Sequence, residues 1–420
     1  MAPIVEAMKK YSADAVIPFH TPGHKQGRGA HELLRELLTV EGLRQEVSLM
    51  EELDDLHEPH ACIKEAQKFA ARLWNADDCL FMVNGTTSAV QAMIFGTLNA
   101  GDLVMIPRNA HRSVISGLIL SGATPIFLPV DFDEEFNLPL NVNTTTIERA
   151  IKKFPQTKAV VLVSPNYYGV AADLLKIAEL VHAAGMILLV DEAHGAHLQF
   201  NDELPISAMD SGADLAAQST HKLLGSLTQT SMLMIRKKFV DVERIKRAAS
   251  LLQTTSPNQL LLASLDIARL QMELEGREKI SEAVELSKRL RAEIKKIHGL
   301  KTFDAVKDFS LDTTKVTVNV QNLGLSGQEA EQILRRDLKI QCELSDAANL
   351  LFLITYADSD EMIAKLIEAL KRLPQQSPIK IPSPILNNEI LRAELSPRET
   401  FYSPTEIIPL KESVGRICAE

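Results

Sequence analysis

Two kinds of apolar pattern alternate along residues 63–235. Stretches in which almost every residue is apolar are predicted strands: Cys79–Val83, Leu103–Ile106, Ile126–Val130, Ala159–Val163, Met186–Val190, Leu215–Ser219 and Met232–Ile235. Stretches with apolar residues at helical spacing include Ile63–Trp74, Ser88–Leu98, Arg112–Leu120, Thr146–Lys153 and Asp173–Ala184. Strands that are apolar throughout, with helices between them, are typical of a parallel sheet covered on both faces. The pattern predicts an α/β fold with a mostly parallel, seven-stranded sheet flanked by helices.

A second, smaller unit follows. Helical periodicity dominates from Lys238 to about His298 and is predicted to bridge two domains. After it, the predicted strands are Lys315–Val320, Lys339–Leu344 and Leu350–Thr355, and the predicted helices are Gly327–Asp337 and Glu361–Leu373. This order predicts a small C-terminal α+β domain.

The remaining segments complete the predicted domain organisation. Residues 1–60 lack regular alternation and carry several prolines and glycines, which predicts an arm with ordered loops. The stretch 374–384 is rich in proline and polar residues and is predicted to be a linker. The predicted organisation is an arm over 1–60, a large domain over 61–300, a small domain over 301–373, and a linker and tail over 374–420.

Composition narrows the class of protein. The chain has 420 residues, of which 45% are hydrophobic and 24% charged, with a net charge of −10. That charge argues against nucleic-acid binding and suits a cationic small-molecule substrate, although it also serves solubility. The four cysteines form no C-x-x-C pair, which indicates reduced thiols in a cytoplasmic protein. The sequence shows neither a signal-peptide core nor an apolar run near the ~18 residues of a membrane helix.

Lys222 carries the strongest chemical signal. It ends the string Ser219-Thr220-His221-Lys222 after an apolar strand, and it lies 31 positions after Asp191, which ends another apolar strand. Pyridoxal phosphate requires a lysine for a Schiff base and a carboxylate to hold its ring nitrogen protonated. A lone lysine is usually a solvated surface charge, but apolar strands bound this one. A partly desolvated lysine has a lowered pKa and becomes a usable nucleophile.

Donors for a phosphate are found in two segments. Asn84-Gly85-Thr86-Thr87-Ser88 follows a strand and opens a helix, where free N–H groups and hydroxyls are available. The alternative is an ordinary capped helix start with Thr87 or Ser88 as N-cap. Ser219 and His221 are further candidates to hold the phosphate.

Three histidines have competing interpretations. His111, after another strand end, is expected either to lie flat over an aromatic cofactor or simply to begin a helix. His194 and His197 leave a minor metal alternative, because with Asp191 they could form a facial triad. The string Asp191-Glu192-Ala193-His194 also imitates a helicase box, but the chain contains no G-x-x-x-x-G-K-[ST] loop.

Taken together, these segments resemble the Orn/Lys/Arg decarboxylase family of pyridoxal-phosphate enzymes, which have the aspartate-aminotransferase fold. The similar blocks cover nearly the whole chain: Phe19–Gly27, Leu53–His57 with Glu65–Gln67, Asn84–Ser88, His111–Ser113, Asp191–His194, Ser219–Lys222, Ser396–Glu399 and Pro409–Ile417. The strings Thr21-Pro22-Gly23-His24-Lys25 and Ser219-Thr220-His221-Lys222 are highly specific in combination.

The resemblance implies a role for each matching residue. Lys222 would be the Schiff-base lysine, Asp191 the partner of the ring nitrogen, and His111 the residue stacked on the ring. Thr86, Thr87, Ser88, Ser219 and His221 would surround the phosphate, with Gly85 in the same loop, and His194 would lie close to the ring. The resemblance also implies a homodimer, or a multiple of dimers, with its sites at the subunit interface.

Two departures from the family pattern stand out. His60-Ala61-Cys62 replaces a glycine-containing turn, which is expected to alter the local loop. The chain also stops at Glu420 where relatives continue, so we expect a truncated product or a shortened variant.

The resulting hypothesis is decarboxylation of a basic amino acid in polyamine metabolism, with arginine favoured, then lysine, then ornithine. The cationic tail of the substrate requires a carboxylate partner, for which the candidates are Asp54, Asp55, Glu343, Glu406 and Glu412. One alternative is an aminotransferase or other pyridoxal-phosphate chemistry, in which Arg392 or Arg398 binds an α-carboxylate. Another is a non-catalytic regulator that has kept the fold.

Overall fold

The computed structural model describes residues 1–304, 307–384 and 386–416. The last residue of the C-terminal block, Ile417, the thiol of Cys418 and the chain end at Glu420 lie outside this range. Within it, no helix is both long and apolar enough to cross a membrane.

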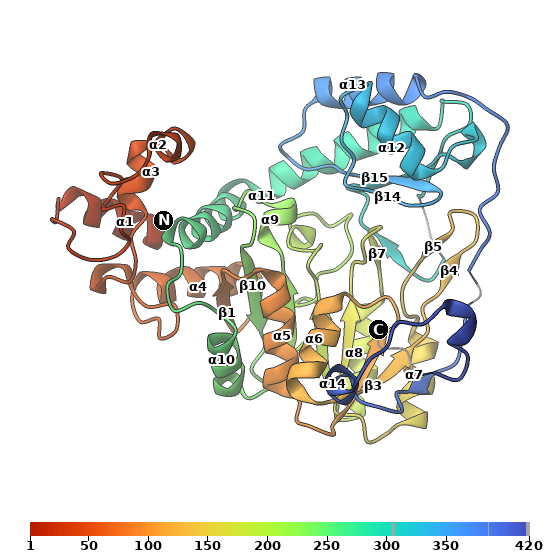
Figure 1. Ribbon diagram of the computed structural model, residues 1–420, viewed down its shortest axis with the longest axis horizontal. Coiled ribbons are helices and arrows are strands. Elements are labelled where there is room, and N and C mark those ends of the chain that lie inside the picture. Colours follow the sequence, from red (N-terminus) through yellow and green to blue (C-terminus); the bar gives the residue numbers. More distant parts are fainter. Residues whose placement is uncertain (305–306, 385, 417–420) are drawn as a thin grey trace.

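The large domain is built on an eight-stranded sheet with the order β1-β10-β9-β8-β6-β2-β3-β16 (Figure 1). All seven strands predicted for this sheet are present: β1 (Asp78–Met82), β2 (Leu103–Pro107), β3 (Thr124–Leu128), β6 (Ala159–Val163), β8 (Ile187–Asp191), β9 (Leu215–Gln218) and β10 (Ser231–Ile235). The five strands from β9 to β3 are parallel, and β1, β10 and β16 are antiparallel to their neighbours. The eighth strand, β16 (Leu391–Arg392), comes from the tail and was not predicted, because two exposed residues carry no alternation signal.

Helices cover both faces of this sheet because each strand places apolar side chains on both of its faces. In β1, Cys79 and Phe81 belong to one buried cluster with α4, α7 and α8. Leu80 and Met82 face another cluster with α5, α6 and α10. These helices are α4 (Cys62–Leu73), α5 (Gly85–Thr97), α6 (Arg112–Ser121), α7 (Thr144–Lys153), α8 (Leu174–Ala183) and α10 (Val242–Leu251). The short elements are α9 (Thr220–Leu223), η2 (Leu198–Phe200), β4 (Phe132–Asp133) and β5 (Leu138–Pro139).

The 36-residue helix α11 (Gln259–Ile294) leads into the small domain. That domain has an antiparallel sheet with the order β11-β13-β15-β14, covered by α12 (Gly327–Arg336) and α13 (Asp360–Lys371). Its strands are β11 (Lys301–Thr302), β13 (Lys315–Asn319), β14 (Leu344–Ser345) and β15 (Asn349–Leu353), and η3 (Gln321–Leu323) lies between β13 and α12. Helix α12 begins with a capping box between Ser326 and Glu329.

The predicted strand Lys339–Leu344 is wrong over most of its length. Only Leu344 belongs to a strand, and β14 extends from it to Ser345. Lys339 has a left-handed backbone with φ of 60°, and the N–H of Ile340 bonds back to the carbonyl of Leu334 in α12. The start of the segment therefore completes the end of a helix, and only Glu343 and Leu344 at its other end bond to β15.

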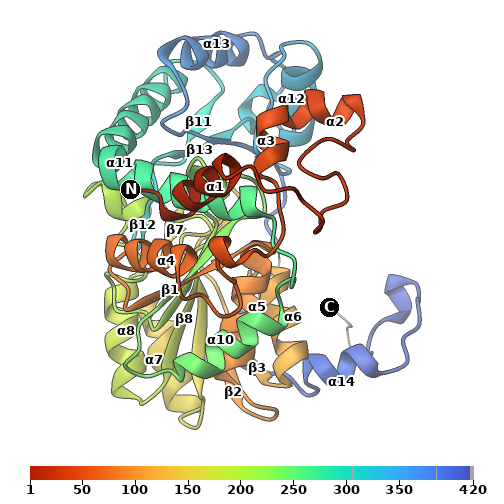
Figure 2. The same cartoon turned by 90° about the vertical axis from the view of Figure 1, so that its left-hand side faces the viewer.

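The arm contains more regular structure than its sequence pattern predicted. It forms α1 (Pro3–Ala13), α2 (Glu32–Leu38), α3 (Val40–Gln45) and η1 (Glu51–Leu53) (Figure 2). Ile4, Met8 and Tyr11 of α1 are buried in the core shared with α4 and α11. Their helical spacing was a usable signal that the prolines and glycines after residue 17 obscured.

Two segments join the parts of the molecule. The tail returns to the large domain, where β16 pairs with β3 and Arg398 of α14 (Pro397–Tyr402) donates to the carbonyl of Ile119 at 2.7 Å. A short ladder pairs β7 (Val170–Ala171) with β12 (Ser310–Leu311), and the N–H of Asp312 donates to the carbonyl of Gly169 at 2.8 Å. The final element, η4 (Leu410–Glu412), is exposed.

Candidate active site

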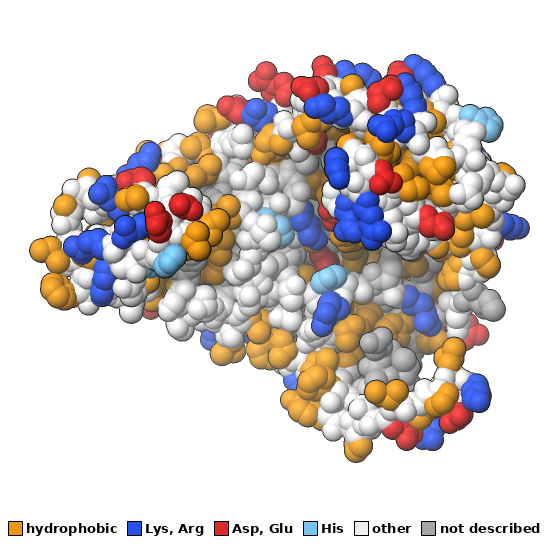
Figure 3. Space-filling view, turned by 45° about the horizontal axis from the view of Figure 1, so that its top comes forward, with side chains coloured by type: hydrophobic (Ala, Val, Ile, Leu, Met, Phe, Trp, Pro, Cys, Tyr) orange, Lys and Arg blue, Asp and Glu red, His pale blue; other side chains and the backbone are white. Residues whose placement is uncertain are grey.

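A cavity of about 480 Å³ lies at the carboxyl ends of the parallel strands, beneath the small domain. This is the edge at which open α/β sheets bind ligands. In the space-filling view, basic and histidine side chains are visible around the hollow between the two domains (Figure 3). Nine of the ten predicted cofactor-site residues line the cavity: Gly85, Thr86, Thr87, His111, Asp191, His194, Ser219, His221 and Lys222.

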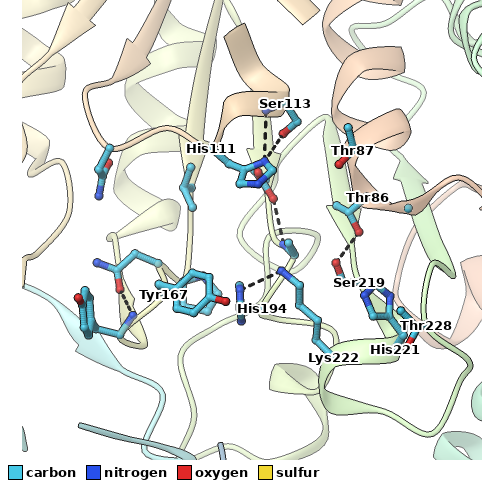
Figure 4. Close-up of a pocket in the computed structure, with 18 of the residues that line it drawn as sticks. Thr86, Thr87, His111, Ser113, Tyr167, His194, Ser219, His221, Lys222 and Thr228 are labelled. Carbon is cyan, nitrogen blue, oxygen red and sulfur yellow. Dashed lines mark hydrogen bonds between the residues drawn. The ribbon is translucent and has the colours of Figure 1, made fainter. Parts of the chain in front are cut away.

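Lys222 projects into the cavity from the single turn of α9, directly after β9. Its Nζ lies 3.0 Å from Nε2 of His194 (Figure 4). Partial burial lowers the pKa of the Lys222 amine, and the negative charges of Asp191 and Glu343 partly offset that effect. The position thus favours an unprotonated, nucleophilic amine.

Asp191 is the last residue of β8 and is only 3% exposed. One carboxylate oxygen accepts a hydrogen bond from the N–H of Ala193 at 3.1 Å. Burial raises the pKa of Asp191, whereas this N–H group and the positive charge available on His111 and Lys222 act in the opposite direction. A carboxylate in this setting is suited to pair with a cationic N–H group inside the cavity.

The start of α5 offers donors to an anion. The helix begins at Gly85, and its N-cap residue, Asn84, makes no side-chain capping bond, so the predicted N-cap role of Thr87 or Ser88 is wrong. Gly85 has φ of +74°, and a Cβ built on it meets no heavy atom within 4 Å. The N–H of Gly85 donates to the carbonyl of Gln229 at 2.8 Å, and Thr86 and Thr87 follow it along the cavity wall. The start of a helix beside a cavity is a setting in which proteins bind phosphate.

Hydroxyl groups complete this anion cradle, which we define as Gly85, Thr86, Thr87 and Ser219. The Oγ1 of Thr86 lies 2.5 Å from Oγ of Ser219, the N-cap residue of α9 (Figure 4). It also donates to Oγ of Ser231 in β10 at 2.8 Å, so the hydroxyl groups link α5, α9 and β10. The tenth predicted residue, Ser88, lies elsewhere. It is buried, and its hydroxyl donates to the carbonyl of Gly85 at 2.9 Å.

The other two predicted histidines lie at the cavity wall. His111 is the N-cap of α6 and accepts a hydrogen bond from the N–H of Ser113, so it both begins a helix and faces the cavity. His221 donates from Nδ1 to the carbonyl of Thr230 at 2.6 Å. Partial burial is the main reason that the pKa of His221 is lowered.

The sequence analysis missed Lys315, the first residue of β13. Its side chain is 0% exposed, and its Nζ lies 2.7 Å from Nδ1 of His194. Burial lowers the pKa of Lys315 to about 8. The signal that identified Lys222, a lysine next to an apolar strand, was also present at Lys315.

Tyr167, Tyr168 and Asp346 were also missed, whereas Glu343 was among the predicted substrate partners. Tyr167 and Tyr168 line the cavity from the β6–β7 connection. Tyr167 donates to Glu343 at 2.8 Å, and Tyr168 donates to Asp346 at 2.6 Å. Burial, reinforced by Glu343, raises the pKa of Tyr167 to about 12. The small domain therefore brings two carboxylates to the cavity rim.

The five carboxylates predicted as substrate partners differ in whether they contact the cavity. Asp54 is buried and accepts bonds from the N–H groups of Asp55, His60, Ala61 and Ile63. Asp55 accepts from the N–H of His57, Glu406 pairs with Arg416, and Glu412 lies on the exposed η4. Glu343 is the member of this set whose carboxylate contacts a side chain lining the cavity.

The residues of the metal and aminotransferase alternatives do not form a second site in the described part of the chain. His197 lies 3.2 Å from Asp312. Within the described part of the chain, no group of three or more His, Cys, Asp or Glu side chains is placed to hold a metal ion. Arg398 donates to backbone carbonyls of α6, and Arg392 lies on β16 at the sheet edge, so neither lines the cavity.

Comparison with solved structures defines the class of fold. The chain is similar to a lysine decarboxylase of Francisella novicida, with a TM-score of 0.79 and 23% identity over 89% of this chain. The similar region spans about 60% of that protein's length. An alanine–glyoxylate aminotransferase from Nostoc sp. is similar with a TM-score of 0.62 and 20% identity, over 76% of this chain and 88% of that one. The fold is of the aspartate-aminotransferase type, as predicted.

Sequence comparison identifies the family. Residues 2–320 match the family described as "Orn/Lys/Arg decarboxylase, major domain". The chain is 40% identical over 427 residues to an arginine decarboxylase of Bacillus subtilis, and the match covers 100% of this chain and 87% of that protein. It is 37% identical to an arginine decarboxylase of Halalkalibacterium halodurans, with the same coverage of both chains. The chain belongs to the Orn/Lys/Arg decarboxylase family, which confirms the predicted family and enzyme class.

Proposed function

We propose that this protein uses pyridoxal phosphate to decarboxylate arginine, releasing the corresponding amine and carbon dioxide. The observation that carries the proposal is the convergence of Lys222, Asp191 and the anion cradle in one cavity. The named relatives support arginine as the substrate: four arginine decarboxylases are 37–40% identical over the whole chain. Lysine and ornithine are the second and third candidates.

The residues of the cavity fit this cofactor. Its volume of about 480 Å³ is in the range of small-molecule sites. The anion cradle would hold the phosphate, with His221 beside it, and Asp191 would pair with the ring N–H. When bound, pyridoxal phosphate supplies a ring that accepts the electron pair of the broken bond between Cα and the carboxylate.

The protein's own groups then have distinct tasks. Lys222 would bind the cofactor covalently, because burial lowers the pKa of its amine, and the unprotonated amine is the reactive form. His111 would cover one face of the ring from the N-terminus of α6. Ser88 would support the first turn of α5 without contacting the cofactor. Orientation of the Cα–carboxylate bond determines that carbon dioxide leaves in preference to the Cα proton.

Recognition of the substrate tail is assigned to Glu343. Its carboxylate accepts from Tyr167, whose ring lies beside the imidazole of His194 with 4.6 Å between centroids. A carboxylate at this rim would form charge-assisted hydrogen bonds with a guanidinium group, and Arg-carboxylate pairs are frequently bidentate. The partner residue is therefore supplied by the small domain.

A homodimer remains part of the proposal. The arm leaves large apolar side chains exposed, with Phe19 at 92% and Leu37 at 79%. Where such side chains form a contiguous patch, the patch is typical of a surface that a partner covers. Light scattering on the purified protein would give the mass, and a monomer would reject this part of the proposal.

The test is incubation of the purified protein with pyridoxal phosphate and each of arginine, lysine and ornithine, with products identified by mass. We expect the amine derived from arginine to form fastest. Lys222→Ala should abolish turnover and the visible absorbance of the bound cofactor, whereas the exposed-lysine control Lys176→Ala should keep both. A keto acid product would favour the aminotransferase alternative, and no amine from any substrate would reject the proposal.

A further inference from the structure

Two glutamine side chains bond to the connection between β1 and α5. Val83 and Asn84 form this connection, and Gly85 begins both α5 and the anion cradle. Gln229 reaches it from the connection between α9 and β10, and Gln253 from the connection between α10 and α11. The start of the cradle is thus bonded to two segments that are distant from it in the sequence.

Gln229 makes two contacts with this connection. Its side-chain NH2 group donates to the carbonyl of Val83 at 2.5 Å, and its backbone carbonyl accepts from the N–H of Gly85 at 2.8 Å. The partners fix these directions, because a backbone carbonyl only accepts and a backbone N–H only donates. One residue therefore bridges the two sides of Asn84.

The backbone of Gln229 is strained in the conformation that allows both contacts. Its φ is +86°, in the left-handed region that favours glycine. A non-glycine residue persists in this region only where its surroundings hold it, and such residues cluster at functional sites. Gln229 lines the cavity with its neighbour Thr228, which is labelled in Figure 4. The strained position therefore lies at the candidate active site.

Gln253 holds the same connection through the other backbone group of Val83. Its Oε1 accepts from the N–H of Val83 at 2.9 Å, and its Nε2 donates to the carbonyl of Phe81 at 3.4 Å. The preceding residue, Leu252, accepts from the side chain of Asn84 at 3.2 Å. Val83 is 2% exposed, and a buried backbone group without a partner is costly. Both glutamines therefore contribute to the shape of this connection.

These contacts determine which donors remain for an anion. The first N–H groups of a helix have no partner within it, and the N-cap residue Asn84 makes no side-chain capping bond. Gln229 takes the N–H of Gly85, which leaves those of Thr86 and Thr87 beside the cavity. Their positions follow from that of Gly85, because the three residues belong to one helical turn.

We infer that Gln229 and Gln253 are positioning residues for the cofactor phosphate: they fix Val83 and Gly85, and thereby hold the first turn of α5 where its donors meet the phosphate. The inference rests on the proposed binding of pyridoxal phosphate. It adds which residues outside the cradle determine the affinity for the phosphate group. It also predicts a selective effect on phosphate-bearing ligands, which a general loss of stability would not produce.

The test compares the binding of two ligands to the cofactor-free protein, pyridoxal phosphate and pyridoxal, which lacks the phosphate. Equilibrium dialysis gives both dissociation constants. Gln229→Met keeps the length of the side chain and removes its donor. It should weaken binding of pyridoxal phosphate about tenfold and change binding of pyridoxal by less than about twofold. Gln253→Met should act in the same direction, and Gln328→Met, at an exposed site on α12, should match the wild type.

Gln229→Gly separates the side chain from the backbone strain. Glycine suits a φ of +86°, so this variant is expected to fold even if Gln229→Met does not. It lacks the amide that bonds to Val83, and it should also lower the preference for pyridoxal phosphate over pyridoxal. Thermal unfolding is measured in parallel, because a merely structural role would lower stability and weaken binding of both ligands alike.

The outcomes separate this inference from the proposed function. Unchanged dissociation constants in the folded variants, or equal weakening for both ligands, would overturn the inference and leave the proposed function intact. A wild-type protein that does not bind pyridoxal phosphate would instead reject the proposed function, and the inference with it. A loss that is confined to pyridoxal phosphate would support the inference.

Discussion

The two walls of the cavity are built in different ways. The wall from the large domain carries Asp191, Lys222 and the anion cradle at the ends of strands in one buried sheet. On the opposite side, which we call the second wall, Lys315 and Glu343 of the small domain lie behind the lining and hydrogen-bond to two cavity residues of the large domain, His194 and Tyr167. The first wall has the groups that the proposed cofactor requires, and the second has the carboxylate proposed to bind the substrate tail.

The two walls are therefore expected to affect different properties of the enzyme. Groups at the strand ends are fixed relative to one another by the backbone ladders that join β8, β9, β10 and β1. The contacts that small-domain residues make with cavity residues depend on how the small domain is placed against the large domain. Changes in the first wall should therefore reduce the rate of reaction, and changes in the second should alter affinity.

The largest effect is expected for Asp191→Asn. The amide keeps an oxygen for the N–H of Ala193 but removes the negative charge that would hold the ring nitrogen protonated. We expect kcat to fall by roughly 10²–10³-fold, the cost of losing one preorganised electrostatic contact. Steady-state kinetics would measure it, with the exposed Asp202→Asn as control. A kcat within threefold of the wild type would remove Asp191 from the first wall's chemistry.

Glu192→Gln tests the support behind the first wall. Glu192 is fully buried and accepts from Gln218 and from the N–H of Ala208, both at 2.7 Å. Burial raises its pKa from 4.5 to about 8. Because the folded-state pKa is raised, the stability that the protonated carboxyl contributes is present below pH 4.5 and is lost as the pH rises toward 8.

The expected outcome is a difference in the pH dependence of unfolding. Between pH 5 and 8 the wild-type protein should lose stability, on the order of a few kcal/mol, relative to Glu192→Gln, whose amide does not titrate. Thermal unfolding at several pH values would measure this difference. Glu278→Gln, at an exposed position, should follow the wild type. Parallel curves for wild type and Glu192→Gln would show that Glu192 is ionised in the folded protein.

Glu343→Gln tests the second wall. Glutamine retains an oxygen for the Tyr167 hydroxyl but removes the charge that would pair with the substrate tail. A charge-assisted hydrogen bond contributes about 1.5–3 kcal/mol, so KM for arginine should rise about 10–100-fold with a smaller change in kcat. Glu368→Gln, on the exposed face of α13, serves as the control. An unchanged KM would assign the substrate tail to another group.

The smallest effect is expected for Tyr168→Phe. It removes the 2.6 Å hydrogen bond to Asp346, whose carboxylate still accepts from the N–H groups of Ala348 and Asn349. We expect unfolding to be easier by about 1 kcal/mol, with little change in turnover. Chemical denaturation would measure it against Tyr402→Phe at an exposed position. A large loss of turnover instead would give Tyr168 a role in catalysis.

The same division explains what the sequence could predict. Lys222 and Asp191 each end a run of local apolar pattern, so the strands and the residues at their ends were recognisable together. Lys315 and Glu343 carry no local pattern that relates them to His194 or Tyr167, because their contacts depend on how two sheets are docked. The helix α1 was recognisable from the spacing of Ile4, Met8 and Tyr11, whereas β16 has two residues and depends wholly on its partner β3.

The ladder between β7 and β12 has a consequence for protein engineering. Tyr167 and Tyr168 shortly precede β7, and Lys315 shortly follows β12. The four paired residues of this ladder therefore position the small domain relative to the large domain. A chimera that exchanges the small domain with that of a relative should therefore place its crossover before Ser310, so that β12 travels with β13. A crossover between Leu311 and Lys315 would combine the β12 of one protein with the lysine of the other. The contact between that lysine and His194 would then no longer be ensured by the ladder.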